Sequence, residues 1–366
     1  MPNPSAQCPP LRFTAGFRLP VAAAAALWLG LAASAAPAAA VPRQDRPPRK
    51  VTIGTVTCGY AIFNQPLEVR LQQMDAYVQM MAYEAAGDPA VKQLDLVVLP
   101  ETFLNRPGDI PEKEAVRIDE ILPRIAACAK LHGCYIVAGA LLQEPGPPLH
   151  YSNTALLVDR SGNLAGIYRK VHPVAPQGSD SVEGGTTPGR DFPVFDCDFG
   201  RLGMQICFDM LYPDGWAALA KQGAEIVAMP SASPDTVHPR TYAMEHQYYV
   251  VSATPRDHAA VYSPLGLIEA EATETGAVLV HQIDLSYAIL HWEAVLDDGA
   301  ALTRKYGDRV GYHYYRSEDA GIFWSNDPKT TIGQMISSLG LVDSDANVER
   351  IRQLDDKVRG GPPVMP

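Results

Sequence analysis

Three residues of reactive type stand where predicted apolar strands end. Glu101 follows LDLVVLP, Lys170 follows LAGIYR, and Cys207 ends RLGMQIC. A carboxylate, an ammonium and a thiol together can act as base, cation and nucleophile. In open α/β sheets, ligands bind in the crevice beyond the strand ends. The pattern therefore predicts a catalytic site with a cysteine nucleophile at the edge of a sheet.

The elements that position these residues alternate between strand and helix patterns. VTIGTVT (51–57) is short and β-branched, residues 67–87 have apolar side chains at helical spacing, and LDLVVLP is a continuous apolar strand. A second round predicts one helix over 112–133, despite Pro123, and a strand over 134–142. Further strands are predicted in YSNTALLVD, LAGIYRK, FPVFDCD, RLGMQIC, AEIVAMP, YYVVSAT and GAVLVHQID, and further helices in GWAALAKQG and PRTYAMEH. Strands buried on both faces that alternate with helices indicate a layered α/β architecture.

The first 40 residues have the pattern of a signal peptide. Two arginines precede LPVAAAAALWLGLAASAAPAAA, an apolar run of small residues, and we predict cleavage after Ala40. Residues 41–50 are then a linker, 51–285 one catalytic domain and 286–366 a C-terminal extension. The protein is therefore expected to be exported, either to the periplasm or out of the cell.

Charge and composition disfavour several classes of partner and cofactor. Residues 1–40 hold two of the 30 basic residues and none of the 41 acidic ones, so the rest of the chain has a net charge of −13. Such a charge argues against nucleic acid as a partner and, after cleavage, against an anionic membrane. The nine histidines include no pair at metal-ligand spacing with a supporting carboxylate, and there is no CxxC pair. We predict no metal and no cofactor.

Five cysteines follow residue 40, and an odd number leaves at least one thiol free or paired between chains. Their irregular spacing is not a disulfide framework, although Cys128 and Cys134 are near enough in sequence to leave a disulfide open. A protease dyad of cysteine and histidine would leave Glu101 and Lys170 without a role. We therefore do not favour that alternative.

Three segments resemble the signature segments of the carbon–nitrogen hydrolase (nitrilase) superfamily, in the same order and at similar spacing. They are VVLPETF, GIYRKVHP and GRLGMQICFDMLYPDGW, and the resemblance covers roughly residues 51–285. It implies a four-layer α-β-β-α sandwich of the nitrilase type, usually paired through the helical layer that contains the nucleophile turn. It also implies that Glu101 is the general base, Lys170 the catalytic lysine and Cys207 the nucleophile.

The resemblance extends to Glu183 in DSVEGGTTPG, which matches the region where many members place a second glutamate near the lysine. We expect Glu183 and the backbone N–H of Phe208 to contact the substrate. After Cys207 the chain reads Phe208-Asp209, whereas nitrile-cleaving members usually have tryptophan and glutamate there. An aromatic residue followed by aspartate is typical of many amide-cleaving members, so the resemblance favours an amidase.

The chemistry of these residue types agrees with that assignment. A free cysteine has a pKa of about 8.5, so an adjacent base must take its proton during attack. Glu101 can take this proton, give it to the departing amine and then activate water. Lys170 and the Phe208 N–H can stabilise the oxyanion. We predict hydrolysis of a small amide or N-carbamoyl compound through a cysteine thioester.

Several alternatives stay open at this point. The same thioester could form from a nitrile, or could pass its acyl group to an amine in an acyl transferase. A binding protein without catalysis is disfavoured because all three reactive residues are present. The sequence does not identify the acyl group or the leaving amine.

An aromatic-rich segment, LTRKYGDRVGYHYYRSEDAGIFWSNDP (302–328), follows the predicted domain. We predict that this weakly periodic arm packs on its own core or on a partner subunit, because so many exposed aromatic residues need a partner. We therefore expect a homodimer or a larger homo-oligomer.

Overall fold

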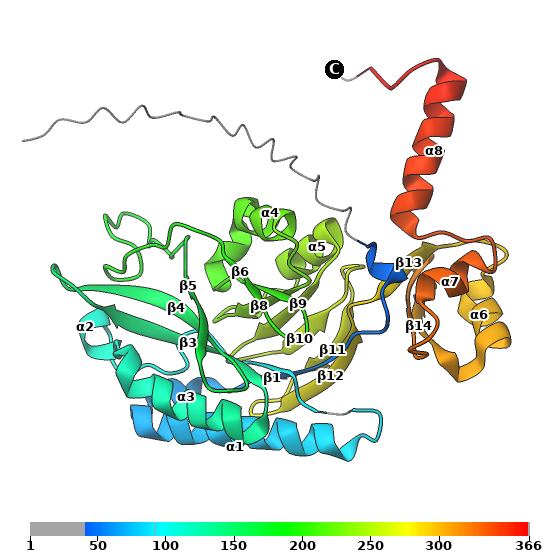
Figure 1. The fold of residues 1–366 in the computed structure, drawn as a ribbon. Coiled ribbons are helices and arrows are strands. Elements are labelled where there is room, and N and C mark those ends of the chain that lie inside the picture. The colour runs from blue at the N-terminus through cyan, green and yellow to red at the C-terminus, as the bar shows by residue number, and fades with distance from the viewer. Residues whose placement is uncertain (1–40, 92, 365–366) are drawn as a thin grey trace, which may run out of the picture. The chain divides into compact units, whose positions relative to one another are not determined.

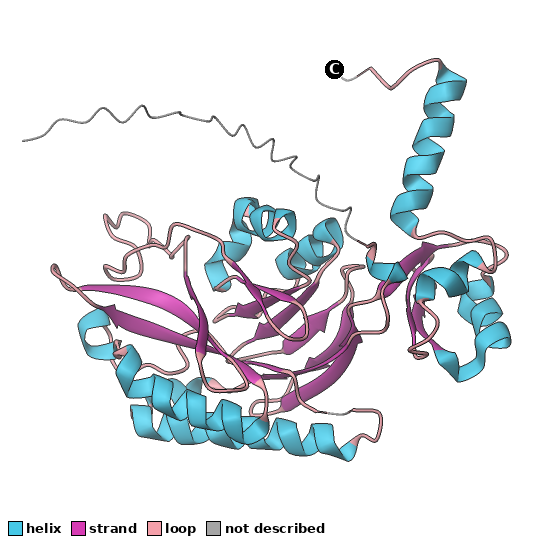
Figure 2. Ribbon diagram, in the orientation of Figure 1, coloured by secondary structure: helices cyan, strands magenta, loops and turns pink. Residues whose placement is uncertain are grey.

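The computed structural model describes residues 41–91 and 93–364, and the predicted signal peptide lies outside the described residues. Two six-stranded sheets form the centre of this part of the chain (Figures 1 and 2). The first has the order β12-β1-β2-β3-β4-β5, and only β1, β2 and β3 run parallel in it. Its strands are β1 (Lys50–Val56), β2 (Leu96–Val98), β3 (Tyr135–Glu144), β4 (His150–Val158), β5 (Leu164–Arg169) and β12 (Val278–Asp284).

The second sheet repeats this plan with the order β11-β10-β9-β8-β7-β6, in which β7, β8 and β9 run parallel. Its strands are β6 (Val194–Asp196), β7 (Arg201–Met204), β8 (Ile226–Pro230), β9 (Tyr249–Ala253), β10 (Ala259–Tyr262) and β11 (Ile268–Ala272). Each sheet therefore has its three parallel strands in the middle, and the carboxyl ends of these three strands lie on the same edge of the sheet.

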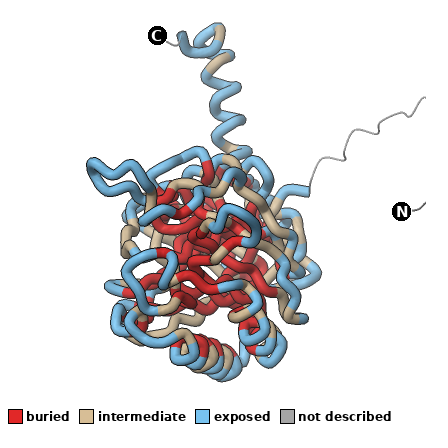
Figure 3. The backbone as a smooth tube through the Cα atoms, turned by 90° about the vertical axis from the view of Figure 1, so that its left-hand side faces the viewer, coloured by how far each residue is buried: buried red, intermediate tan, exposed pale blue. Residues whose placement is uncertain are grey.

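Helices cover the outer face of each sheet, and the inner faces pack against each other (Figures 1 and 2). The helices α1 (Leu67–Gly87) and α3 (Ile118–His132) lie on the first sheet, and α4 (Pro213–Lys221) and α5 (Val237–His246) lie on the second. The predicted four-layer α-β-β-α sandwich is confirmed. Because both faces of each sheet are covered, strands such as β2 read as continuous apolar runs, and Figure 3 shows the buried residues gathered inside.

The predicted single helix over 112–133 is wrong, because the structure divides it. A short helix α2 (Pro111–Glu114) ends before an extended segment, and α3 begins at Ile118. In that segment the Val116 N–H donates to Leu141 O at 3.0 Å, and Gln143 N donates to Val116 O at 2.9 Å. Pairing with β3 thus replaces helical hydrogen bonds at Val116. Pro123 lies inside α3 without ending it, as predicted.

Residues 286–341 form a second, smaller unit of structure, which we call the C-terminal module. Its sheet has the order β13-β15-β14, with the helices α6 and α7 beside it. The bounds are β13 (Tyr287–His291), β14 (Val310–Tyr315), β15 (Ala320–Ser325), α6 (Ala300–Tyr306) and α7 (Ile332–Ser337). One face contributes Tyr287, Ile289 and Ile322 to the core between the two large sheets, and the other packs its own apolar cluster. The segment 302–328, expected as a weakly periodic arm, is therefore regular structure built around two strands.

The last helix, α8 (Ser344–Arg359), extends away from the C-terminal module (Figures 1 and 3). It exposes an apolar stripe at helical spacing, which consists of Val348, Ile351, Leu354 and Val358. Within residues 41–91 and 93–364, no helix has both the length and the apolar character needed to cross a membrane.

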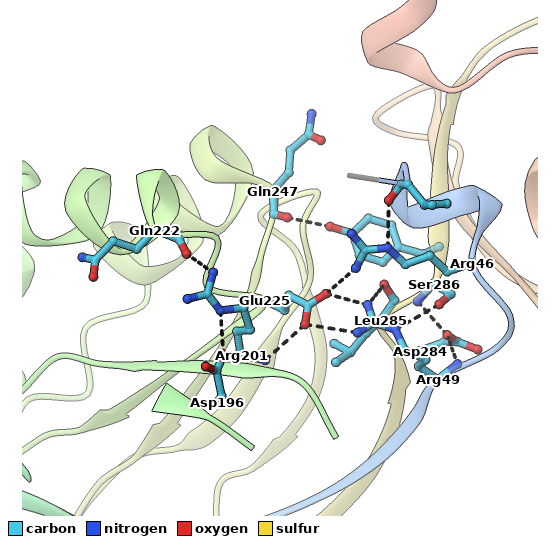
Figure 4. Close-up of polar contacts among 12 residues, drawn as sticks. Arg46, Arg49, Asp196, Arg201, Gln222, Glu225, Gln247, Asp284, Leu285 and Ser286 are labelled. Carbon is cyan, nitrogen blue, oxygen red and sulfur yellow. Dashed lines mark hydrogen bonds and ion pairs between the residues drawn. The ribbon is translucent and has the colours of Figure 1, made fainter. Parts of the chain in front are cut away.

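The segment before β1, predicted as a linker, is held against the sandwich by ion pairs (Figure 4). Arg46 and Arg49 both donate to the carboxylate of Glu225, which precedes β8. Glu225 also accepts from the backbone N–H of Arg201 at 3.1 Å. The cysteines of the described chain, including Cys128 and Cys134, are all free thiols.

Candidate active site

Glu101 follows β2 at the carboxyl end of the parallel strands. Its backbone lies directly against β3, where a Cβ on Gly139 would come within 2.4 Å of Pro100 O. The next residue, Thr102, has a φ of +52°, which turns the chain sharply after the strand. Glycine at position 139 therefore allows the close approach that brings the Glu101 side chain into the interior, where the residue is 5% exposed.

Lys170 follows β5, and its backbone N–H donates to Asn153 O at 2.8 Å, so that the pairing of β4 with β5 continues to the site. The side chain is 1% exposed. Its Nζ donates to Glu101 Oε1 at 2.7 Å and to Glu183 Oε1. An ammonium has three N–H donors, so one N–H is left for another acceptor.

Cys207 does not end a strand, and that prediction is wrong in detail. The strand β7 ends at Met204, and Cys207 begins a 3₁₀ turn, Cys207–Leu211. The reason is the side chain of Asp209, whose Oδ2 accepts from the backbone N–H of Ile206 at 2.9 Å. That bond takes the N–H of Ile206 out of the sheet and starts the turn. Cys207 itself has a φ of +44°, a strained conformation that is often found at functional sites.

Asp209 also ties this nucleophile turn to the residues on either side of Lys170. Its Oδ2 accepts from the hydroxyl of Tyr168 at 2.8 Å, and its Oδ1 accepts from the backbone N–H of His172 at 2.8 Å. In the sequence, Asp209 served only to distinguish the amidase branch. In the structure it fixes the position of the thiol relative to the ammonium.

Three hydrogen-bond donors surround the carboxylate of Glu101. Besides Lys170, the amide of Asn153 donates to Oε1 at 2.8 Å, and the backbone N–H of Ala232 donates to Oε2 at 2.9 Å. The Asn153 Nδ2 also donates to Glu183 Oε2 at 3.0 Å, so Asn153 joins the two carboxylates. Asn153 was not predicted, although a polar amide inside the apolar run YSNTALLVD was a usable signal.

The charges in this cluster stabilise one another. Burial alone would raise the pKa of Glu101, but the Lys170 ammonium, with hydrogen bonds from Lys170 and Asn153, lowers this pKa below its ordinary value. Burial alone would lower the pKa of Lys170, yet the negative groups Glu101, Cys207 and Glu183 raise it. Glu101 is therefore a carboxylate and Lys170 an ammonium at neutral pH.

The thiol of Cys207 is protonated in this environment. Burial, followed by the nearby Glu101 carboxylate, raises the pKa of Cys207 to about 12, and Lys170, Ser231 and the Ala232 N–H only partly oppose this effect. The resting site thus pairs a thiol with an ionised carboxylate. Nucleophilic attack from this state needs proton transfer to a base, and the Glu101 carboxylate lines the same cavity as the thiol.

A cavity of about 400 Å³ opens onto these groups. Glu101, Lys170, Cys207, Asn153 and Glu183 all contribute to its lining. A larger hollow of about 790 Å³ lies elsewhere and includes none of the predicted site residues. In the part of the chain that the structure describes, no group of three or more His, Cys, Asp or Glu side chains could hold a metal ion.

The two predicted substrate contacts are placed differently. Glu183 lines the cavity and contacts Lys170, with a φ of +40° in its loop. The ring of Phe208 is not part of the lining and packs against Tyr212, with ring centroids 6.1 Å apart. The prediction for Phe208 concerned its backbone N–H, which stands in the first turn of the 3₁₀ helix, where N–H groups lack helical partners.

Comparison with known proteins agrees with this architecture. The family model of carbon-nitrogen hydrolases matches residues 56–290, which include both large sheets apart from β1, of which only the last residue, Val56, is matched. The chain belongs to the carbon–nitrogen hydrolase family. The predicted membership is thereby confirmed, and the protein is a hydrolase of carbon–nitrogen bonds. The match ends inside β13, so the rest of the C-terminal module and α8 lie beyond it.

Relatives of this carbon–nitrogen hydrolase include named amidases. The omega-amidase NIT2 of Danio rerio is 30% identical over 236 residues, which cover 57% of this chain and 82% of the relative. The omega-amidase NIT2 of Homo sapiens is 28% identical over 221 residues, which cover 54% and 79%. Among solved structures, Nit3 of Saccharomyces cerevisiae superposes with a TM-score of 0.54 at 23% identity, covering 65% of this chain and 90% of Nit3. That structural likeness supports the fold.

Proposed function

We propose that this hydrolase cleaves a small amide through a thioester on Cys207, with Glu101 as general base and Lys170 as the cation that stabilises the oxyanion. The observation that carries the proposal is the convergence of a buried thiol, a carboxylate and an ammonium on one cavity. The relatives named as amidases support an amide rather than a nitrile as the substrate.

In the first half of the reaction, Glu101 takes the proton of Cys207 while Sγ attacks the carbonyl carbon. The negative charge that develops on the carbonyl oxygen is met by the remaining N–H of Lys170 and by the Phe208 N–H. Collapse of this intermediate breaks the C–N bond as protonated Glu101 gives its proton to the leaving nitrogen. The acyl group then stays on Cys207 as a thioester.

In the second half, Glu101 is again a carboxylate and takes a proton from water, whose oxygen attacks the thioester carbon. The C–S bond breaks, the thiolate of Cys207 regains the proton, and the acid leaves. Asn153 and the Ala232 N–H hold the Glu101 carboxylate in place through both halves. No cofactor takes part in these steps.

The test is a product screen on purified residues 41–366, with primary amides, N-carbamoyl compounds and nitriles. We expect release of ammonia or amine from at least one amide, no rate with Cys207→Ala, and an unchanged rate with Cys197→Ala. Both variants should stay folded, because Cys→Ala keeps the Cβ and removes a single sulfur atom. Turnover of nitriles only, or acyl transfer to added amine without hydrolysis, would replace the proposed reaction with one of the two alternatives.

We further propose that the protein is exported after cleavage near Ala40. The support is the N-terminal sequence pattern alone. Sequencing of the native protein should give a first residue at or near Val41, and a native soluble protein that begins at Met1 would contradict the proposal.

We also propose that the protein self-associates, with α8 at the contact between chains. The support is the exposed stripe of Val348, Ile351, Leu354 and Val358, since such a stripe on an extended helix favours a partner. Most aromatic residues of the segment 302–328 pack within the chain, namely Tyr306, Tyr312, Tyr314, Phe323 and Trp324, so α8 is the better candidate for this contact.

A further inference from the structure

The active-site cavity is lined by more carboxylates than cations. Glu101, Asp109, Glu114 and Glu183 line it, and Lys170 is the one Lys or Arg among the described residues of its lining. Glu101 and Glu183 already share the Lys170 ammonium. The other two carboxylates of the lining, Asp109 beside α2 and Glu114 within it, make no ion pair with Lys170, and we call them the rim carboxylates.

Two cations lie near these carboxylates without being part of the cavity lining. Lys113 pairs with Asp109 at 2.8 Å, and both side chains are exposed. Arg70 lies near Glu114 but donates to backbone carbonyls that include Thr102 O at 3.1 Å. Glu114 itself accepts one hydrogen bond, from Asn105 Nδ2 at 3.4 Å. The lining therefore presents Asp109 and Glu114 to a molecule in the cavity without Lys113 or Arg70.

The inner wall offers a further acceptor without a donor. Both amide hydrogens of Asn153 are taken by Glu101 and Glu183, which also fixes the orientation of the amide. The Asn153 Oδ1 is buried and has no hydrogen-bond partner within the described chain. A buried acceptor of this kind favours a ligand that donates hydrogen bonds.

From this lining we infer that the substrate is an aliphatic amide that carries a protonated amine, which lies at the rim beside Glu114 and Asp109. The inference rests on the proposed amidase function and adds the substrate's charge class. A carboxylate in the same position would face Glu114 and Asp109 with no unpaired cation to receive it. The net charge of −13 beyond residue 40 also attracts cations, which favours a positively charged substrate over a negatively charged one.

The test uses three amides that share four methylene groups and release ammonia: 5-aminopentanamide, hexanamide and adipamic acid. Their free ends are an ammonium, a methyl group and a carboxylate. We expect kcat/KM to fall in that order, with the cationic amide preferred to the anionic one by about tenfold or more at low salt, and by less at high salt because exposed charges are screened.

Two variants of α2 locate the source of the preference. Glu114→Gln should lower kcat/KM for 5-aminopentanamide about fivefold relative to hexanamide, mainly through KM. Glu112→Gln is the matched control, because Glu112 lies in the same helix but is exposed and outside the cavity. It should leave the ratio between the three amides unchanged.

The outcomes separate this inference from the function on which it rests. Hydrolysis that favours hexanamide or adipamic acid would overturn the charge class and leave the amidase intact. A preference for the cationic amide that survives Glu114→Gln would overturn the placement of the amine beside Glu114. Release of ammonia from none of the three would count against both. Calorimetric titration of Cys207→Ala with each amide gives a readout without turnover, and the cationic amide should bind most tightly.

Discussion

Glu101 and Glu225 are both carboxylates held by cations, yet the structure completes one cluster and leaves the other open. Glu225 accepts hydrogen bonds from Arg46, Arg49 and the backbone of Arg201, and these bonds fasten the segment before β1 to the second sheet (Figure 4). Around Glu101, by contrast, one N–H of Lys170 has no protein acceptor in the described cluster, and the thiol of Cys207 lies beside the cavity.

The difference shows how the same residue types serve stability in one place and chemistry in the other. A saturated ion cluster gains nothing from a ligand, because its donors and acceptors are already paired. Hydrogen bonds from Asn153 and Ala232 and to Asp209 hold the Glu101 cluster in place, but the cluster leaves a thiol, a carboxylate and an ammonium N–H at the cavity. Substitutions in the two clusters should therefore affect different measurements.

The largest effects are expected in the catalytic cluster. Glu101→Gln keeps the shape of the side chain but removes the base, and Lys170→Ala removes the oxyanion donor. Each should lower kcat by about a hundredfold or more. Steady-state assays of both variants, with circular dichroism as a check of folding, measure this effect. A loss below about threefold in both would mean that the roles are assigned to the wrong residues.

The Glu225 cluster should respond in stability instead. Glu225→Gln weakens several charged hydrogen bonds and should cost about 2 kcal/mol of unfolding free energy, with kcat/KM close to wild type. Urea unfolding of the variant tests this expectation. The control is Asp196→Asn, because Asp196 pairs with Arg201 at an exposed position and should matter by less than about 1 kcal/mol. If Glu225→Gln and Asp196→Asn lowered the free energy of unfolding equally, the Glu225 cluster would have no special role in stability.

The pH dependence of kcat/KM should reflect the lowered pKa of Glu101. Because Lys170 lowers the pKa of Glu101 below the ordinary 4.5, the base stays ionised as the pH falls toward that value. The acid limb of kcat/KM should therefore lie below pH 4.5, and the stability that Glu101 contributes should be present above its unfolded pKa and lost as pH falls through its folded pKa. An acid limb near pH 6 would contradict the assignment of Glu101 as the base.

The smallest effect on activity is expected at α8. Deletion of residues 346–366 keeps Asp343, which accepts from the Ile289 N–H at 2.9 Å, and removes the apolar stripe. We expect the truncated protein to lose self-association and to keep its activity, because the described site residues all come from one chain. Light scattering measures the first effect. Leu354→Asp should lose self-association like the deletion, and the control Gln353→Asp should behave like wild type. An unchanged oligomer in both the deletion and Leu354→Asp would show that α8 is not at the contact between chains.

The parts of the fold that could be predicted are those fixed by local pattern. The helix over 67–87 and most strands of the two sheets follow from apolar periodicity, as does the layered architecture, whereas the short strands β10 and β11 were not predicted. The break at Val116 could not be predicted, because it depends on pairing with β3, about 25 residues away along the chain. The strands β14 and β15 were missed because their alternation is weak and β15 pairs with the distant β13.

In the candidate site, too, some residues could be predicted from the sequence and others could not. Reactive residues at strand ends pointed to Glu101, Lys170 and Cys207, which the structure brings to one cavity. The residues that hold them, Asn153 and Asp209, act through side-chain contacts between distant segments, and no local pattern reports such contacts.

Mass spectrometry of the acyl-enzyme tests the central claim most directly. Wild-type protein quenched during turnover of a slowly hydrolysed amide should carry the acyl mass on the peptide that contains Cys207, and Cys207→Ala should carry none. The adduct should appear and decay at rates that match turnover. Full turnover without any adduct, or an acyl group on Cys58, Cys128, Cys134 or Cys197 instead, would contradict the account.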